Sequence, residues 1–185
     1  MTRYRRDKTP GASWFFTVVT YQRRELLCDK PVRIALRNAI SRVRIRHPFV
    51  IDAWILLPNH FHCIWTLPDG ESNYSLRWKL IKSYVTRACG KYYLQPEDLP
   101  PSKTRRRESV IWQRRFWEHR IKNEKDYALH MDYLHYNPVK HGYCKAPSKW
   151  RYSTLHRLKA EGIYPEDWGE CNSSKMNMTI DCGEI

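Results

Sequence analysis

The amino-acid sequence predicts an α+β fold in which helices pack against an antiparallel sheet. Segments rich in β-branched and aromatic residues alternate with segments whose apolar residues recur at helical spacing. Their order is strand, helix, strand, strand, helix, strand, helix. Two of the strands are separated by a short Pro-Asn turn, which favours an antiparallel hairpin. With 185 residues, the chain is long enough for one domain with a substantial core.

The first half of the chain contains three predicted strands and one long helix. Residues 13–21 are mostly aromatic or β-branched, which predicts a strand. A helix is expected from Pro31 to His47, because proline is favourable in the first turn and apolar residues follow at helical spacing. Residues 49–57 and 60–67 form the two strands of the expected hairpin.

The second half of the chain contains a basic helix, a loop, a strand and two further helices. Residues 75–93 predict a helix with a basic face. Residues 95–109 are rich in proline and then basic, which is typical of an exposed, mobile loop. A fourth strand is expected at residues 111–117, a third helix at residues 124–136 and a short helix near residues 154–161.

The resulting order, βαββαβ followed by a helix, is that of a ferredoxin-like fold with helices on one face of the sheet. Residues 1–168 are expected to form a single domain that begins with a basic arm. A C-terminal segment of this domain begins at about residue 143, and residues 169–185 are expected to be a disordered tail.

The composition favours a polyanionic partner. Lys and Arg number 33 against 19 Asp and Glu, a net charge of +14, so nucleic acid is the first candidate and an unrelated basic enzyme is the alternative. Eight Trp and twelve Tyr among the arginines suit single-stranded nucleic acid. The six cysteines form no C-x-x-C pair, which argues against a zinc ribbon. Without a signal peptide or a membrane-length apolar run, the expected location is the reducing cytoplasm.

A histidine pair on the third strand is the strongest functional signal. His60 and His62 flank Phe61, and side chains of a strand alternate between its two faces. The histidines therefore project from one face and can share a divalent metal, while Phe61 anchors the strand in the core. The alternative is a pair of ordinary histidines at the surface or at the edge of the core.

The third helix carries two neighbouring stripes. The apolar stripe is assigned to the core: Tyr127, Met131 and Leu134. The adjacent stripe is polar: His130, Tyr133 and Asn137. Because Tyr133 and Asn137 are four residues apart, both can be presented to the metal that His60 and His62 hold. In the alternative interpretation, Tyr133 is a packing residue and Asn137 is a helix C-cap.

Such a site suits the cleavage of a phosphodiester. A phenol has a pKa of about 10 and is a poor nucleophile at neutral pH, so it needs an activated electrophile. A Mg²⁺ or Mn²⁺ ion on the phosphate neutralises charge and orients the phosphorus for in-line attack. Two imidazoles and one amide oxygen leave coordination positions for phosphate oxygens and water.

The motifs of this chain resemble those of a known family. LPNHFHCIW (57–65) resembles the His-hydrophobe-His motif of the HUH single-strand DNA nucleases. Together with WQRRFWEH (112–119), DYLHYNPVKHG (132–142) and WRYSTLHR (150–157), it is similar to the REP-associated tyrosine transposases. These are bacterial relatives of the single-tyrosine insertion-sequence transposases. The resemblance covers roughly residues 3–168.

The resemblance implies the HUH endonuclease fold and a role for each site residue. His60 and His62 would ligate Mg²⁺ or Mn²⁺. Tyr133 would be the nucleophile that cleaves single-stranded DNA, forming a 5′-phosphotyrosine and releasing a 3′-OH. Asn137 would be the third ligand, where several relatives in the wider group have a glutamine.

The resemblance also implies the partners. The substrates would be repetitive extragenic palindromes (REP), which are hairpins with a short single-stranded guide sequence. The enzyme would be a monomer in the bacterial cytoplasm, associated with the nucleoid, and its C-terminal segment would touch the active site.

Basic residues near these motifs are the candidate DNA contacts, because arginine and lysine bind phosphates. The candidates are Arg5, Arg6, Arg77, Lys82, Arg105, Arg106, Arg114, Arg115 and His119. Three residues are candidates for a place near the active site: Glu118, His119 and His130.

Three other functions are weighed against the transposase. A domesticated, non-catalytic protein that binds DNA hairpins would retain the basic surface, but the intact set of His60, His62 and Tyr133 argues against it. A replication or relaxase-type HUH enzyme usually has a longer domain and other histidine spacing. An RNA-binding ferredoxin-like module would carry the RNP pattern of aromatic residues, which the sequence lacks.

Overall fold

The computed structural model describes residues 6–93 and 111–170. Arg5, Arg105, Arg106, the whole of the expected loop at residues 95–109 and the tail from residue 171 lie outside the described residues. The principal elements are β1 (Ser13–Val19), α1 (Lys30–Arg46), β2 (Val50–Leu56), β3 (His60–Thr66), α2 (Tyr74–Tyr93), β4 (Trp117–Arg120), α4 (Glu124–Lys140) and α5 (Leu155–Ala160). Short 3₁₀ turns occur at Tyr21–Arg23 and Pro147–Lys149.

The four strands form one sheet in the order β2-β3-β1-β4, and all three neighbouring pairs are antiparallel. This is the ferredoxin-like arrangement expected from the order of the elements, and the predicted α+β fold is confirmed. The hairpin of β2 and β3 places His60 at the first position of β3, directly after the turn. None of the described helices combines the length and the hydropathy needed to cross a lipid bilayer.

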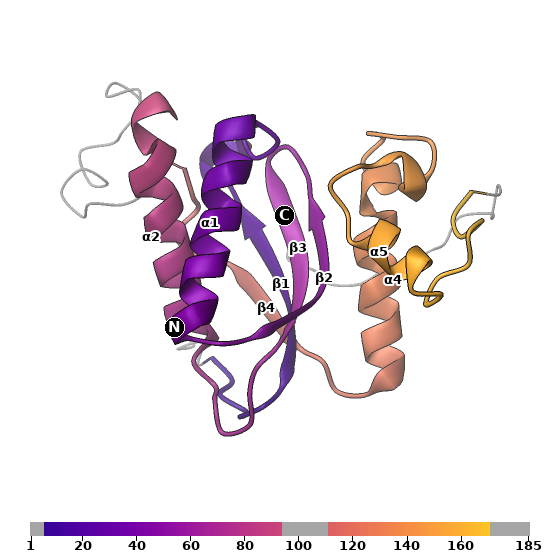
Figure 1. Ribbon diagram of the computed structural model, residues 1–185, viewed down its shortest axis with the longest axis horizontal. Helices are drawn as coiled ribbons and strands as arrows, with labels where there is room; N and C mark the ends of the chain where they lie inside the picture. Colours follow the sequence, from indigo (N-terminus) through magenta and orange to yellow (C-terminus); the bar gives the residue numbers. More distant parts are fainter. Residues whose placement is uncertain (1–5, 94–110, 171–185) are drawn as a thin grey trace, which may run out of the picture.

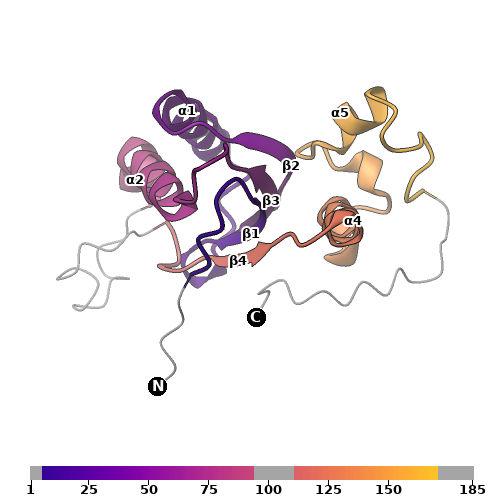
Figure 2. The same ribbon diagram turned by 90° about the horizontal axis from the view of Figure 1, so that it is seen from below.

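Helices cover both faces of the sheet. Figure 1 shows α1 and α2 on one side of the strands and α4 with α5 on the other, and Figure 2 shows the same layers from below. One core cluster lies beneath α1 and α2 and includes Phe61 and Trp65, and the other lies beneath α4 and includes Phe15 and Ile64. The expectation of helices on one face holds for α1 and α2 only. Strand β3 is buried on both sides, and the second layer of helices covers the face that carries His60, His62 and Ile64.

The fourth strand begins later than the sequence predicts. It spans Trp117–Arg120 and pairs with the beginning of β1, whereas Trp112 forms a single bridge with Thr20. Ile111 and Trp112 are buried in the core beneath α1 and α2, so their apolar character reflects packing rather than a strand. Sequence periodicity does not separate a short buried segment from a strand.

Helix α4 continues past the position where the sequence predicts its end. Pro138 lies inside the helix, which runs to Lys140. The chain then turns at Gly142, whose φ of +72° favours glycine. The backbone N–H groups of Gly142 and Tyr143 donate to the carbonyls of Val139 and Pro138, which closes the last turn. Asn137 is therefore a helical residue with its side chain on a helix face, and it is not the C-cap.

Candidate metal centre and nucleophile

Strand β3 holds the two histidines on the face that α4 covers. Their ring centroids are 5.0 Å apart, and the two residues are 1% and 0% exposed. Phe61, between them, points to the opposite face and stacks on Trp54 at 4.5 Å. The alternation that the sequence predicts is therefore observed for His60, Phe61 and His62.

Hydrogen bonds fix how the imidazoles are oriented. Thr17 lies opposite His62 in the β1–β3 ladder, and its Oγ1 is 2.9 Å from His62 Nδ1. His60 Nδ1 is 2.6 Å from Asn59 Oδ1. Histidines that ligate a metal commonly bond a neighbour through the other ring nitrogen. With Nδ1 engaged in this way, Nε2 is the nitrogen suited to a metal, so the donor set fits a divalent ion.

Helix α4 brings Tyr133 against this pair. The ring centroids of Tyr133 and His62 are 5.6 Å apart, and Tyr133 is 2% exposed. Lys140 lies two turns further along the same face, where its Nζ donates to Tyr133 Oη at 2.9 Å. A cationic donor stabilises a phenolate oxygen more than a neutral phenol. The sequence interpretation missed Lys140, because it ended the helix at Asn137-Pro138.

Asn137 lies between two residues that reach the histidines, one in α4 and one directly after its end. Tyr133 precedes it by one turn and contacts His62, while His141 follows by one turn and has its ring centroid 5.1 Å from that of His60. Asn137 is 0% exposed. Residues four apart share a helix face, so Asn137 lies on the stripe of α4 that also carries Tyr133. The structure thus brings His60, His62 and Tyr133 together, with Asn137 buried on the same helix stripe.

A second polar cluster lies further along the same face of the sheet. His119 of β4 is bonded through Nε2 to Asp126 Oδ2 at 2.9 Å, and Asp126 Oδ1 is 3.0 Å from His130 Nδ1. One ligand atom from each residue lies within 4.8 Å of the other two, so this His/Asp group could hold a metal ion. The two imidazoles stack at 4.5 Å with an interplanar angle of 13°. His130 Nδ1 also lies 2.8 Å from the backbone carbonyl of Asp126, so hydrogen bonds within the protein already connect the three residues.

The environment shifts the pKa values in this second cluster. Partial burial alone would raise the pKa of Asp126, but hydrogen bonds from His119 and the Lys122 backbone N–H outweigh it and lower the pKa. Burial lowers the pKa of His130. Phe15 separates this cluster from His62, with ring centroids 4.9 Å from His130 and 5.3 Å from His62. His130 and His119 therefore lie near the metal centre without joining it.

Arg77, a candidate DNA contact, and Glu118, a candidate for a place near the active site, make contacts within the fold instead. Arg77 is 1% exposed, and its guanidinium donates to Pro48 O and Asn73 O and pairs with Glu71 at 3.4 Å, so a DNA phosphate cannot reach it in this fold. Glu118 projects from β4 on the face opposite His119, because neighbouring strand residues alternate.

Glu118 pairs there with Arg6 at 3.3 Å, and the guanidinium of Arg6 lies 4.1 Å from the Phe116 ring centroid. Lys82 donates to Gln113 O at 2.9 Å. Burial and, less strongly, the charge of Arg6 lower the pKa of Lys82 to about 7, so Lys82 carries only part of a positive charge at neutral pH.

Arg114 and Arg115 are exposed in the segment before β4, where they are accessible to a polyanion. His119 is partly buried in the His/Asp cluster, and its ring stacks on Trp117 at 5.9 Å. Among the described candidate DNA contacts, the two arginines are thus the most open to solvent.

Comparisons with known proteins agree on one group of relatives. No family model matches the sequence. A REP-associated tyrosine transposase of Escherichia coli (strain K12) is 46% identical over 168 residues, which is 91% of both chains. A Haemophilus influenzae protein named for the same transposases is 43% identical over 170 residues, 91% of this chain and 94% of the relative. A solved REP-associated tyrosine transposase bound to a REP hairpin superposes with a TM-score of 0.77 and 45% identity, covering 95% of this chain and 96% of the other.

With these relatives, the ferredoxin-like sheet and the tyrosine beside its histidine pair define an enzyme that cleaves and transfers DNA strands. The matches to these relatives cover between 91% and 95% of the chain. The chain belongs to the family of REP-associated tyrosine transposases.

Proposed function

We propose that this enzyme cleaves and rejoins single-stranded DNA at REP-type hairpins through a covalent bond to Tyr133. The observation that carries the proposal is the contact of Tyr133 with His62, on the helix stripe that also carries Asn137. In the cleavage step, the oxygen of Tyr133 bonds to phosphorus and the bond from phosphorus to the 3′ oxygen breaks. The products are a 5′-phosphotyrosine and a 3′-OH, and the reverse step with a new 3′-OH joins two strands.

His60, His62 and Asn137 are the proposed ligands of Mg²⁺ or Mn²⁺. When bound, the metal would supply charge neutralisation at the scissile phosphate. The chain itself positions the nucleophile, because the rigid packing of α4 on the sheet holds Tyr133 beside the histidines. Lys140, bonded to the Tyr133 oxygen, would stabilise the phenolate as its proton departs.

The proposed partner is a DNA hairpin with single-stranded flanks. The relative solved with a REP hairpin covers 95% of this chain, and the net charge of +14 favours phosphate binding. The histidines and the tyrosine come from one chain and already pack together. This supports a site that is complete in a monomer. We further propose a cytoplasmic, nucleoid-associated enzyme, since its substrate is genomic DNA.

The experiment that tests this function compares the wild-type enzyme with Tyr133→Phe on a labelled hairpin with single-stranded flanks. The variant lacks only the nucleophilic oxygen and its bond to Lys140. We expect metal-dependent cleavage by the wild type, none by the variant, and hairpin affinity unchanged within about twofold. Hairpin binding by the wild type without any cleavage would favour the alternative, a non-catalytic protein that binds DNA hairpins.

A further inference from the structure

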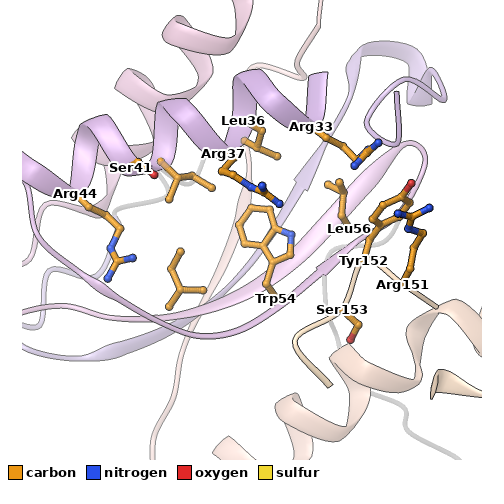
Figure 3. Close-up of a pocket in the computed structure, with 12 residues that line it drawn as sticks. Arg33, Leu36, Arg37, Ser41, Arg44, Trp54, Leu56, Arg151, Tyr152 and Ser153 are labelled. Atoms are coloured by element: carbon orange, nitrogen blue, oxygen red, sulfur yellow. The ribbon is translucent and has the colours of Figure 1, made fainter. Parts of the chain in front are cut away.

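A cationic cavity lies between α1 and β2, on the face of the sheet opposite α4. Its volume is about 400 Å³, within the range of about 300–1,000 Å³ typical of small-ligand pockets. Figure 3 shows the ring of Trp54 at its centre, with arginines around it. The residues that characterise the cavity are Arg33, Arg37, Arg44, Arg151, Trp54 and Tyr152.

The arginines make this cavity suitable for an anion. Four guanidinium groups line it, and none of its lining residues is acidic. Arg33 and Arg44 each use Nε–H to bond a backbone carbonyl, of Cys28 at 2.9 Å and of Phe49 at 3.0 Å. Those bonds fix the direction of each side chain while the terminal N–H fork is the part that binds phosphate oxygens. Positive charges held together in this way repel each other until an anion binds.

The two aromatic residues that line the cavity, Trp54 and Tyr152, have different roles. One face of Trp54 is covered by Phe61 at 4.5 Å, and the half-buried indole lines the cavity, where a second ring can stack on it. Tyr152 instead lies beneath two guanidinium groups, Arg33 at 4.8 Å and Arg151 at 5.2 Å from its ring centroid. Trp54 is thus the stacking surface, and Tyr152 holds two cations at the rim.

A row of aromatic rings connects the cavity to the metal centre around the edge of β2. Successive ring centroids are 5.9 Å apart from Tyr152 to Trp150, 5.5 Å from Trp150 to Tyr143, 6.0 Å from Tyr143 to His141 and 5.1 Å from His141 to His60. Tyr143, Trp150 and Tyr152 are half-buried and His141 is exposed, so this row reaches the surface. Aromatic side chains along a basic groove are typical of a path for single-stranded nucleic acid.

We propose that the cavity binds one unpaired nucleotide of the DNA strand that runs to the metal centre. The base stacks on Trp54, and the adjacent phosphate is held by Arg37 and Arg151. An unpaired base is the occupant that fits, because bases inside a duplex stack on each other and offer no free face. The inference rests on the proposed function, since it assumes that the strand at Tyr133 is DNA with single-stranded flanks.

The test measures hairpin affinity without metal, so that binding does not depend on cleavage. Two labelled hairpins share one stem, and only one carries single-stranded flanks. For Arg37→Ala/Arg151→Ala we expect the flanked hairpin to bind at least about tenfold more weakly, because the loss of even one charge-assisted phosphate contact has an effect of that size. Binding of the blunt hairpin should be unchanged. Arg46→Ala, an exposed arginine of α1 that does not line the cavity, is the matched control.

Equal losses for both hairpins would overturn the proposal, because these arginines would then contact the duplex. No loss for either hairpin would also overturn it. Failure of the wild type to bind any hairpin would instead contradict the proposed function, so the two failures are distinguishable. As a second measurement, 2-aminopurine is placed at each flank position in turn. Quenching at one position that disappears in Trp54→Leu is expected, and quenching that persists in a folded Trp54→Leu protein would contradict stacking on Trp54.

Discussion

At the scale of single residues, the contact between Lys140 and Tyr133 bears on how the proposed nucleophile loses its proton. The ammonium donates to the phenol oxygen at 2.9 Å and lies 4.8 Å from the ring centroid. Before attack, the phenol must lose a proton, and the neighbouring cation favours the charged product. Lys140 is therefore a positioning and charge-stabilising residue in this account, while Tyr133 makes and breaks bonds.

Replacing Lys140 should slow catalysis without preventing hairpin binding. We expect Lys140→Met to reduce the rate of adduct formation by about ten- to hundredfold, the range for loss of one hydrogen bond to a charged group. Lys140→Arg keeps the charge and should retain more of the rate. Single-turnover kinetics at saturating hairpin measure this directly. An unchanged rate in Lys140→Met would contradict the role.

The histidine pair should control metal affinity. His60→Ala or His62→Ala removes one of three proposed ligands, and each should weaken binding of Mn²⁺ and reduce cleavage at limiting metal. Titration calorimetry with Mn²⁺ gives the affinity independently of activity. His156→Ala is the control, because this exposed histidine of α5 bonds the backbone carbonyl of Trp150 and lies outside the histidine pair. If Mn²⁺ affinity were the same in all three variants, the pair would not be the metal site.

At the scale of elements, α4 shows what the sequence could and could not predict. Its two stripes follow from helical spacing, and His130, Tyr133 and Asn137 are buried as that spacing implies. The predicted end of the helix is wrong, because Asn-Pro usually marks a helix boundary. Here the helix continues for one more turn and closes at Gly142. Lys140 was missed for that reason. Long-range packing decides such endings, and local sequence does not show it.

His135 of α4 should make the stability of the fold depend on pH. It lies on the side of the helix away from Tyr133, where its Nε2 is 3.0 Å from Thr154 Oγ1, and burial lowers its pKa from 6.5 to about 3. Between these values the unfolded chain binds a proton that the folded chain does not. The stability that this group contributes is therefore present above pH 6.5 and is lost as the pH falls toward about 3.

The contribution of His135 to the free energy of unfolding changes by at most about 1.4 kcal/mol per pH unit. Urea denaturation at pH 7, 6 and 5 should show a shallower decline for His135→Gln than for the wild type, since glutamine does not titrate. Identical declines in the two proteins would show that His135 does not titrate on unfolding as argued.

At the scale of the whole molecule, the layers explain why one domain can hold a DNA-processing site. Helices α1 and α2 bury one face of the sheet, and α4 with the C-terminal segment buries the other (Figure 1). Helix α4 also carries Tyr133, the proposed nucleophile. The order of elements and the histidine strand could be predicted from alternation and spacing. The second layer and the arginine cavity could not, because they join residues distant in sequence. The Asp126 cluster spans only residues 119–130, but it depends on how β4 and α4 pack together.

The net charge of +14 should make hairpin binding strongly dependent on salt. If about six phosphates are contacted, affinity should fall about 10³-fold between about 50 and about 200 mM salt, because bound counterions are released. Fluorescence anisotropy across this range gives the slope. An affinity that stays constant with salt would mean that the basic surface does not bind the backbone of the hairpin.

The most direct test of the central claim is to locate the covalent bond. The enzyme is incubated with a flanked hairpin and Mn²⁺, and the intact protein and its peptides are analysed by mass spectrometry. We predict a mass increase equal to the 5′-phosphorylated DNA fragment downstream of the cut less one water, with the 5′ phosphate attached to the peptide that contains Tyr133. Cleaved DNA without an adduct, or an adduct on another of the twelve tyrosines, would contradict the account.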